Sequence, residues 1–194
     1  MIILQNFIKK IGVELSADCT EALSKHSFLQ LKKGEYFLKE GHLSNKIGFI
    51  INGTIIHYYN IEGKQITRWV SLHENFVTGF VSFVEKTTSL ENLLCIKNVE
   101  MIVYSRDYFM NTLMNFTEIQ FAWRKILEFN VVGYENRVYQ LLTTNAEKRY
   151  LSFQKIHPQF ISQVPQKYIA SMLGMAPRHL SRVRKNLSKK KLIK

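Results

Sequence analysis

The sequence predicts an α+β fold in three parts. These are an N-terminal antiparallel β-roll or jelly roll at residues 1–115, a long central helix at 116–144, and a C-terminal helix-turn-helix at 145–194. Three observations predict this fold: short alternating strands separated by turn signals, a long stretch free of proline, and two short helical patterns that flank a glycine.

The N-terminal part changes from a helical to an alternating pattern. Ser16 is placed to cap a helix over 17–25. Asn52-Gly53 and Glu62-Gly63 are turn signals of the kind that close β-hairpins, and each follows an apolar run. The predicted strands lie within residues 31–41, 47–51, 54–59, 65–70, 76–77 and 93–104. Short strands at this spacing are typical of a β-sandwich or jelly roll.

The central segment contains no proline and a single glycine, Gly133, which favours one long helix. One apolar stripe has the 4-3-4-3 spacing of a coiled-coil seam, and its residues are Leu127, Val131, Tyr134, Val138 and Leu141. A second apolar face, which would cover the β-roll, contains Ile119, Trp123 and Ile126. We therefore expect a homodimer that forms through this helix; a single amphipathic helix packed on its own domain is the alternative. Asn145 is expected to start a further helix that ends near His157.

Residues 164–187, VPQKYIASMLGMAPRHLSRVRKNL, have the spacing of a helix-turn-helix. The apolar positions of the pattern are Ile169, Leu173, Met175, Leu180 and Val183. Two helices that cross steeply need a small residue where their backbones meet, here Ala170, and a residue that accepts positive φ in the turn, here Gly174. The second helix begins at Ala176-Pro177 and is the one that such motifs place in the major groove of DNA.

Positive charge is concentrated at the same end of the chain. The sequence has 27 Lys and Arg against 15 Asp and Glu, a formal net charge of +12. Residues 143–194 hold twelve of the bases and one acid, Glu147, whereas residues 1–142 are close to neutral. This distribution is typical of a protein that binds a polyanion such as DNA. A merely solvated basic surface and a membrane-surface patch are the alternatives.

The second helix of the motif holds the predicted DNA contacts. Its inward face is expected to contain Leu180, Val183 and Leu187, and its opposite face Arg178, Ser181, Arg182 and Lys185. Arg178 and Arg182 are candidate base contacts, because a guanidinium can donate two hydrogen bonds to O6 and N7 of guanine. His179 and Lys167 are candidates for phosphate contacts or for the interface between the helices. Lys189–Lys191 would add salt-sensitive attraction that does not depend on DNA sequence.

Composition argues against several classes of protein. The 194 residues are 46% apolar, enough for a hydrophobic core, but no stretch approaches the roughly 18 apolar residues that span a bilayer. The N-terminus has no small-residue cleavage site, so we expect no signal peptide. Cys19 and Cys95 are far apart, which suits a reducing cytoplasm and offers no cluster for zinc or an Fe-S cluster. The six histidines show no close pair, so we expect neither a cupin-like jelly-roll metalloenzyme nor any other enzyme.

Two segments resemble a known family. LKKGEYFLKEGHLSNKIGFIINGTIIHYYNIEGKQI is similar to the cyclic-nucleotide-binding β-roll of Crp/Fnr-family regulators, and residues 164–187 are similar to the DNA-binding helices of that family. The resemblance covers nearly the whole chain in the same order. It implies a homodimeric transcription regulator that binds double-stranded promoter DNA, contacts RNA polymerase and does not bind a membrane. The implied mechanism is a shift between two arrangements of the DNA-binding heads. A non-specific nucleic-acid-binding protein is the alternative.

The sequence departs from the family at the recognition helix and at its end. Better-known members have Arg-Glu where this chain has Pro177-Arg178, so their DNA half-site cannot be transferred. The short subgroup with IASMLG-type and LSRVRK-type signatures is the most similar one, and the sequence ends at Lys194. We therefore expect no β-wing after the recognition helix.

The effector pocket of the family is also altered. Its members hold a nucleotide phosphate with a Gly-Glu pair near a short helix and an Arg a few residues later, whereas this chain has Thr78-Gly79 and Ser89-Leu90-Glu91. We expect neither cyclic AMP nor cyclic GMP as effector, because the phosphate would lack a charge-assisted contact. The candidate effector-binding residues, with ordinary core packing as the alternative, are Phe76, Thr78, Gly79, Phe80, Ser82 and Phe83. Haem, with His57 or His73 as a ligand, is a further family option that we do not expect.

Overall fold

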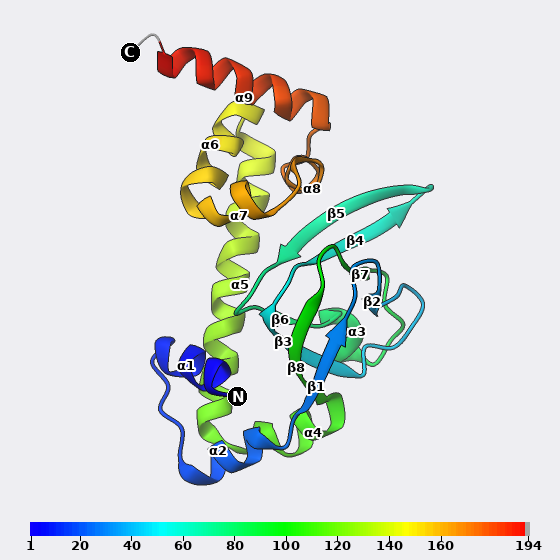
Figure 1. Ribbon diagram of the computed structural model, residues 1–194, viewed down its shortest axis with the longest axis vertical. Helices are drawn as coiled ribbons and strands as arrows, with labels where there is room; N and C mark the ends of the chain where they lie inside the picture. The colour runs from blue at the N-terminus through cyan, green and yellow to red at the C-terminus, as the bar shows by residue number, and fades with distance from the viewer. Residues whose placement is uncertain (193–194) are drawn as a thin grey trace.

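The computed structural model describes the backbone of residues 1–192 and the side chains up to Lys189. One long helix, α5 (Thr117–Thr143), runs through the molecule (Figure 1). Two β-sheets lie beside the middle of α5, the N-terminal helices lie at one of its ends, and the C-terminal helices lie at the other. The predicted α+β fold is confirmed.

Two sheets and several short helices precede α5. The strands are β1 (Ser27–Leu31), β2 (Tyr36–Leu38), β3 (Lys46–Asn52), β4 (Ile55–Ile61), β5 (Lys64–Ser71), β6 (Phe76–Val77), β7 (Asn92–Cys95) and β8 (Val99–Ser105). The helices before α5 are α1 (Ile2–Lys10), α2 (Ala17–Ser24), α3 (Phe80–Glu85), α4 (Arg106–Asn111) and the one-turn 3₁₀ helix η1 (Leu113–Asn115). The helices after α5 are α6 (Ala146–Ile156), α7 (Pro158–Gln163), α8 (Gln166–Met172) and α9 (Pro177–Leu192).

The strands form two antiparallel four-stranded sheets, in the orders β1-β8-β3-β6 and β2-β7-β4-β5. One core cluster contains apolar residues of both sheets, among them Phe37, Ile50, Ile55, Leu93 and Met101. Because side chains alternate between the two faces of a strand, each sheet can supply apolar residues to this shared core. In the second sheet β5 has a strand on one side only, and its other edge faces the C-terminal helices (Figure 1).

The two turn signals of the sequence have different outcomes. The β4–β5 hairpin is confirmed: Ile61 pairs with Lys64, and the two turn residues between them, Glu62 and Gly63, both have positive φ. The hairpin expected at Asn52-Gly53 is wrong, because β3 and β4 belong to different sheets. Gly53 has φ +108° there, and a Cβ would lie 2.3 Å from the carbonyl oxygen of Asn98, so this glycine permits a crossing between the sheets.

The short elements show where local patterns were insufficient. Ser16 caps α2 as predicted and accepts a hydrogen bond from the backbone N–H of Cys19. The expected strand at 31–41 shrinks to β2, and β1 lies before it. The sequence patterns missed α1, α3, α4 and α7. α3, α4 and α7 have six residues each, too few for their apolar spacing to stand out, whereas α1 has nine.

The N-terminal helices and the first part of α5 enclose a second core cluster. Leu4 and Ile8 of α1, Leu23 of α2, and Ile119 and Ala122 of α5 are buried in it. The sequence predicts that the face of the central helix with Ile119, Trp123 and Ile126 covers the β-roll. In the structure this face packs partly against the N-terminal helices. No helix in residues 1–192 is long and apolar enough to cross a bilayer.

The C-terminal helices pack on α5 and on the second sheet. Their core contains Tyr150 of α6, Phe160 of α7, Ile169 of α8 and Leu180 of α9. The same cluster includes Ile56, Tyr58, Val70 and Leu72 from β4, β5 and the loop after β5. The division of the chain at residues 115 and 144 stays a prediction, and this shared cluster shows that the third part packs closely on the first.

Candidate nucleic-acid interface

The motif predicted at 164–187 forms two helices, α8 and α9, joined by a tight turn. Ala170 of α8 is fully buried where the helices meet, and its carbonyl oxygen accepts a hydrogen bond of 3.0 Å from the backbone N–H of Met175. Gly174 has φ +66°, and a Cβ on it would lie 2.9 Å from Leu141 of α5. Both small residues of the pattern therefore sit where another side chain would strain the backbone or collide.

The underside of α9 is apolar and closed. Leu180 and Val183 are buried, as predicted, and Leu187 is partly buried in the same cluster. Arg149 of α6 also lies inside this region, because its Nε donates to the carbonyl oxygen of Leu173 at 3.1 Å and its Nη1 donates to that of Thr144. Although Arg149 counts toward the basic charge of the C-terminal part, its guanidinium holds helix ends together.

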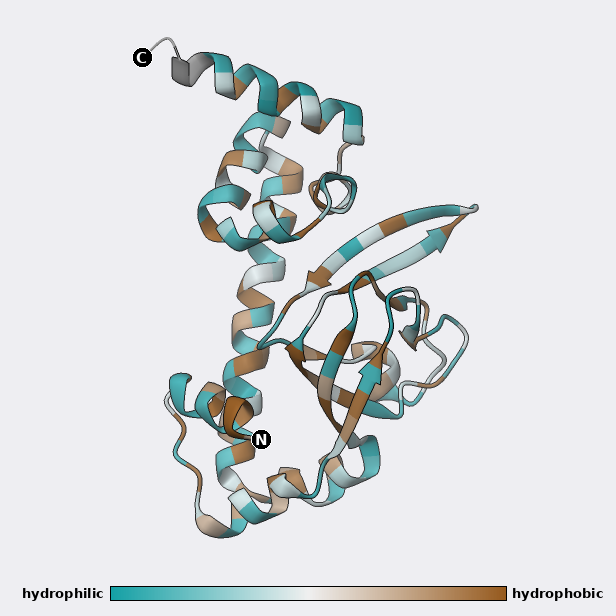
Figure 2. Ribbon diagram, viewed as in Figure 1, coloured by the Kyte–Doolittle hydropathy of each residue, from teal (hydrophilic) through white to brown (hydrophobic). Residues whose placement is uncertain are grey.

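The opposite face of α9 is basic and open. The four residues predicted on this face, Arg178, Ser181, Arg182 and Lys185, are all exposed. No residue in the described part of the chain forms a hydrogen bond or ion pair with their side chains. The segment 177–189 contains five bases and no acid, and Figure 2 shows α9 as a mainly hydrophilic ribbon.

The two other candidate contacts flank this face. His179 and Arg182 line a shallow hollow of about 310 Å³ between α9 and the start of α6, together with Asn145 and Asn186. Lys167 is exposed at the start of α8, and its Nζ lies 4.8 Å from the ring centre of Tyr168. Also at the start of α8, Gln166 accepts a hydrogen bond of 3.2 Å from Arg184 of α9. The side chains of Lys190 and Lys191 lie outside the described residues, as do Ile193 and Lys194, on which the expectation about a wing depends.

Five of the six candidate effector-binding residues are already bonded to neighbouring protein groups or packed in the core, and Phe80 is the exception. Thr78 is 2.9 Å from Ser44 between their hydroxyl oxygens. The Ser82 hydroxyl accepts from the Ser44 N–H at 2.8 Å and donates to the carbonyl oxygen of Thr87 at 2.6 Å. Phe83 is buried and Phe76 partly buried in the N-terminal core. A Cβ on Gly79 would meet Leu38 at 2.3 Å, whereas Phe80 is 42% exposed. Binding of an effector by these six residues stays a prediction.

A buried charged cluster beside this segment was missed. Arg68 of β5 donates to one carboxylate oxygen of Glu91, from Nε at 3.1 Å and from Nη2 at 2.8 Å. His57 lies 3.7 Å from the same carboxylate and 2.9 Å from the hydroxyl of Ser71. Arg68 also donates from Nη1 to the hydroxyl of Tyr134 on α5 at 2.7 Å. The cluster therefore connects β4, β5, the start of β7 and α5.

The charges in this cluster are set by burial and by each other. Burial lowers the pKa of His57 below its ordinary 6.5, so the imidazole is neutral at pH 7. Burial alone would raise the pKa of Glu91, but its hydrogen bonds and charge interactions with His57 and Arg68 bring that pKa below the ordinary 4.5. Arg68 inside an apolar strand was the one sequence signal for this cluster; its partner 23 positions later was not recognisable from spacing.

The cysteines do not form a reactive site. Cys19 and Cys95 are both buried free thiols, and burial raises the pKa of each to about 11. A thiol must ionise to act as a nucleophile or metal ligand, so both groups behave as apolar core residues at neutral pH. No group of three His, Cys, Asp or Glu side chains in residues 1–189 is arranged to hold a metal ion.

No protein-family model and no curated protein matches the chain by sequence. Solved structures do match it. FixK2 from Bradyrhizobium japonicum is 12% identical with a TM-score of 0.73 over 86% of both chains. CLP from Xanthomonas campestris, a c-di-GMP responsive global regulator, is 17% identical with a TM-score of 0.70 over 91% of this chain and 94% of that one. A protein from Eubacterium rectale described as a transcriptional regulator of the Crp/Fnr family is 13% identical with a TM-score of 0.68 over 91% of this chain and 85% of that one.

These matches extend over the sheets, the long helix and the C-terminal helices together. The chain therefore has the fold of Crp/Fnr-family regulators, as the motifs of the sequence predict. At 12–17% identity the likeness concerns the fold, and the chemistry of the site has to be argued from the residues described above.

Proposed function

We propose that the protein is a sequence-specific DNA-binding transcription regulator that acts as a homodimer. The observation that carries this proposal is the outward face of α9. Its basic side chains lack partners in the described part of the chain, and it belongs to a helix whose apolar underside is packed in the C-terminal core. A recognition helix needs both properties, since its side chains must be free to bind base edges and phosphates while the helix itself stays in place.

The dimer is supported by the exposed side of α5. Val131 and Val138 of the predicted seam are 56% and 52% exposed, and Leu142 beside them is 80% exposed. So many exposed apolar side chains on one helix are characteristic of a protein–protein interface. Tyr134, also in the predicted seam, remains 45% exposed although its hydroxyl accepts a hydrogen bond from Arg68. A second copy of α5 would cover this surface and would place two recognition helices on neighbouring half-sites.

The dimer has a direct test. A Val131→Glu, Val138→Glu protein should sediment as a monomer at concentrations where the unchanged protein is a dimer. If the dimer formed, the two new carboxylates would be buried in the seam without partners. Asn136→Lys, on the opposite side of α5 from the seam and exposed, is the control. If the Val131→Glu, Val138→Glu protein kept the sedimentation coefficient of the unchanged dimer, α5 would not form the interface.

We further propose that the segment between β6 and β7 does not bind cyclic AMP or cyclic GMP. Its hydroxyl groups are bonded to neighbouring protein groups, and Glu91 places a carboxylate at one of the positions that match the phosphate-binding region of the family. Because this carboxylate is paired with Arg68, the guanidinium of Arg68 is not free to bind a phosphate. Titration calorimetry with cyclic AMP should give no saturable heat at micromolar concentrations. Saturable heat would contradict this part of the proposal.

Sequence specificity is the property that distinguishes the proposal from non-specific nucleic-acid binding. We would enrich 20-base-pair duplexes from a random pool with the full-length protein. The affinity of the enriched duplex would then be compared with that of a shuffled duplex at physiological salt. We expect the enriched duplex to bind at least about 1,000-fold more tightly. Equal affinity for both duplexes would favour the non-specific alternative. The RNA polymerase contact remains a prediction from the family resemblance.

A further inference from the structure

Three consecutive residues of β5 contact three different parts of the molecule. These residues, Thr67, Arg68 and Trp69, are called the 67–69 segment below. β5 is an edge strand, so its outer backbone groups have no neighbouring strand. Exposed edges of this kind are usually covered by another part of the protein. Here the cover is provided by α5 and by the helix pair that would bind DNA.

Thr67 holds the first helix of the DNA-binding motif. Its backbone N–H donates a hydrogen bond of 2.8 Å to the hydroxyl of Ser171 on α8, and that hydroxyl lies 3.5 Å from the carbonyl oxygen of the same Thr67. The Ser171 hydroxyl is therefore the partner of both the N–H and the carbonyl oxygen of a residue on an edge strand. Trp69 adds an aromatic contact, with ring centres 5.6 Å from His157 and 5.7 Å from Phe160 at the α6–α7 corner.

Arg68 holds α5 to the sheets. Its side chain donates to Glu91 of the loop before β7 and to Tyr134 of α5, and its carbonyl oxygen accepts from Nη1 of Arg137, also on α5. The pairing register between β4 and β5 shifts at this point: His57 pairs with Trp69 and Tyr58 with Thr67, which leaves Arg68 without a partner on β4. Such a β-bulge redirects the side chain and frees backbone groups for other contacts.

We infer that the 67–69 segment positions the recognition helix relative to α5, with Ser171 as the positioning residue. The inference rests on the proposed DNA-binding function. The chain connects α5 to the C-terminal helices through Thr144-Asn145. Rotation of the backbone there would change the orientation of α9 relative to α5. Because β5 holds both α8 and α5, the segment opposes that rotation. In a dimer built on α5, it therefore sets the distance between the two recognition helices and the half-site spacing that the protein prefers.

The first experiment compares Ser171→Ala with the unchanged protein on duplexes that share one enriched half-site. The half-site pair is presented at centre-to-centre spacings of 8 to 13 base pairs, around one helical turn of about 10 base pairs. The unchanged protein should prefer one spacing by about tenfold. Ser171→Ala should bind a single half-site within about twofold of the unchanged protein, because α9 itself is intact, but should prefer its best spacing less than about threefold. Ser162→Ala is the control, since among the described residues its hydroxyl bonds only to Gln159 within its own short helix.

Two outcomes of this experiment would overturn the inference. The first is a Ser171→Ala protein with the full spacing preference. The second is a loss of single half-site binding as large as the loss at the best spacing, which would show that Ser171 only stabilises the helix pair. If the unchanged protein bound the half-site no better than random duplex, the proposed DNA-binding function would fail as well, and the control would show the same result.

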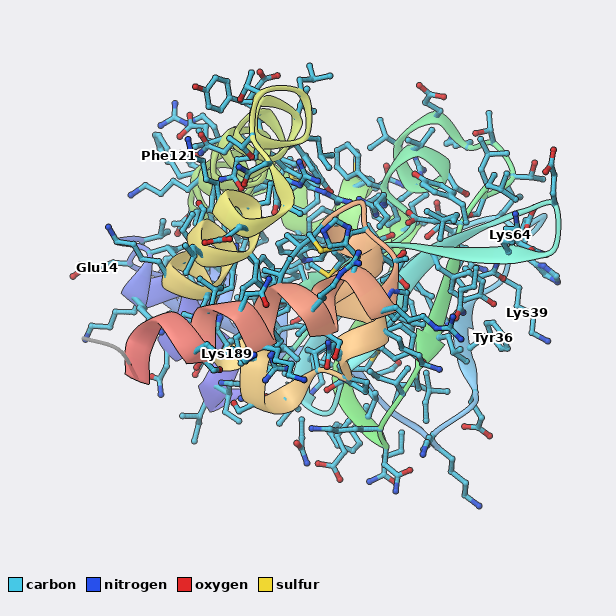
Figure 3. All side chains as sticks on the ribbon, turned by 90° about the horizontal axis from the view of Figure 1, so that it is seen from above. Glu14, Tyr36, Lys39, Lys64, Phe121 and Lys189 are labelled. Atoms are coloured by element: carbon cyan, nitrogen blue, oxygen red, sulfur yellow. The ribbon has the colours of Figure 1, made fainter. Side chains whose placement is uncertain are left out.

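A second experiment needs no DNA. Figure 3 shows Lys64 at the hairpin turn and Lys189 on α9, on opposite sides of the view from above. Spin labels on Lys64→Cys and Lys189→Cys would report the distance between β5 and α9, and the buried Cys19 and Cys95 should not be labelled. In dimers formed with an excess of unlabelled protein, so that only one protomer carries labels, we expect one narrow distance distribution in the unchanged background and a distribution at least twice as broad with Ser171→Ala. An unchanged width would contradict the positioning role even if DNA binding were confirmed.

Discussion

The outward face of α9 and the segment between β6 and β7 are the two places where the sequence predicts ligand contacts, and they differ in how their polar groups are used. On α9, Arg178, Arg182 and Lys185 are exposed without partners among the described residues. Between β6 and β7, Ser82 already has two hydrogen bonds and Glu91 is held by Arg68. The first region can bind a ligand as it stands, whereas the second would first have to break bonds.

A sequence pattern shows which polar residues are present, whereas the structure shows whether their hydrogen-bonding groups are free. A hydrogen bond inside a protein is worth about 1 kcal/mol, and a buried group left without a partner costs about 1–3 kcal/mol. A ligand that displaced the Ser82 or Glu91 contacts would have to compensate for several such losses. Residue types at matched positions therefore indicate where a family binds its effector, but the partners that surround them decide whether the groups are available.

The largest expected effect concerns the outward face of α9. Replacing both Arg178 and Arg182 by Ala should weaken binding to the enriched duplex by about 100-fold or more, since each bidentate base contact is worth about 1–3 kcal/mol. Binding to shuffled duplex should fall much less. Competition measured by fluorescence anisotropy separates the two. Arg184→Ala is the control, because Arg184 is bonded to Gln166 on the flank of α9. An equal loss on both duplexes would make Arg178 and Arg182 phosphate contacts.

A change in the segment between β6 and β7 should lower the stability of the protein and leave its DNA affinity unchanged. Ser82→Ala leaves the backbone N–H of Ser44 and the carbonyl oxygen of Thr87 without their partner, at a cost of about 1–3 kcal/mol in the free energy of unfolding. DNA affinity should stay within about twofold. Thermal and urea unfolding measure the first quantity, with the exposed Ser24→Ala as control. A Ser82→Ala protein of normal stability with altered DNA binding would instead indicate an effector role for this segment.

The smallest effect is a pH dependence of stability that comes from His57, which lies 3.7 Å from Glu91. Because burial lowers the pKa of His57 from 6.5, the unfolded chain binds a proton between the lowered value and pH 6.5 that the folded protein does not. Stability should therefore fall as the pH decreases below about 6.5, by at most about 1.4 kcal/mol per pH unit for each such histidine. His157, whose pKa is also lowered by burial, adds to the same slope.

Urea unfolding between pH 5 and 7.5 measures this slope. His57→Gln should reduce it, and the exposed His42→Gln should leave it as it is. The lowered pKa of Glu91 acts in a separate window, since its contribution is lost only as the pH falls below 4.5. A slope that His57→Gln does not change would show that His57 contributes nothing to it.

Much of the fold could be predicted from the sequence because its signals are local. The Ser16 cap, the Glu62-Gly63 hairpin and the proline-free stretch of α5 each depend on residues close together in the chain. The pairing at Asn52-Gly53 could not be predicted, since a turn signal does not say in which sheet the next strand lies. The inward orientation of Arg149 was equally hidden, because charge alone does not show what a side chain contacts.

The candidate DNA-binding site divides in the same way. The sequence by itself determined the helix-turn-helix, because Ala170, Gly174 and the apolar positions that hold the helices lie within one short segment whose geometry their spacing specifies. The tertiary structure alone decided how that motif is held: Thr67 reaches Ser171 across 104 positions, and Arg68 joins Glu91 and Tyr134. Contacts between residues so far apart follow from the packing of sheets and helices and leave no periodic trace in the sequence.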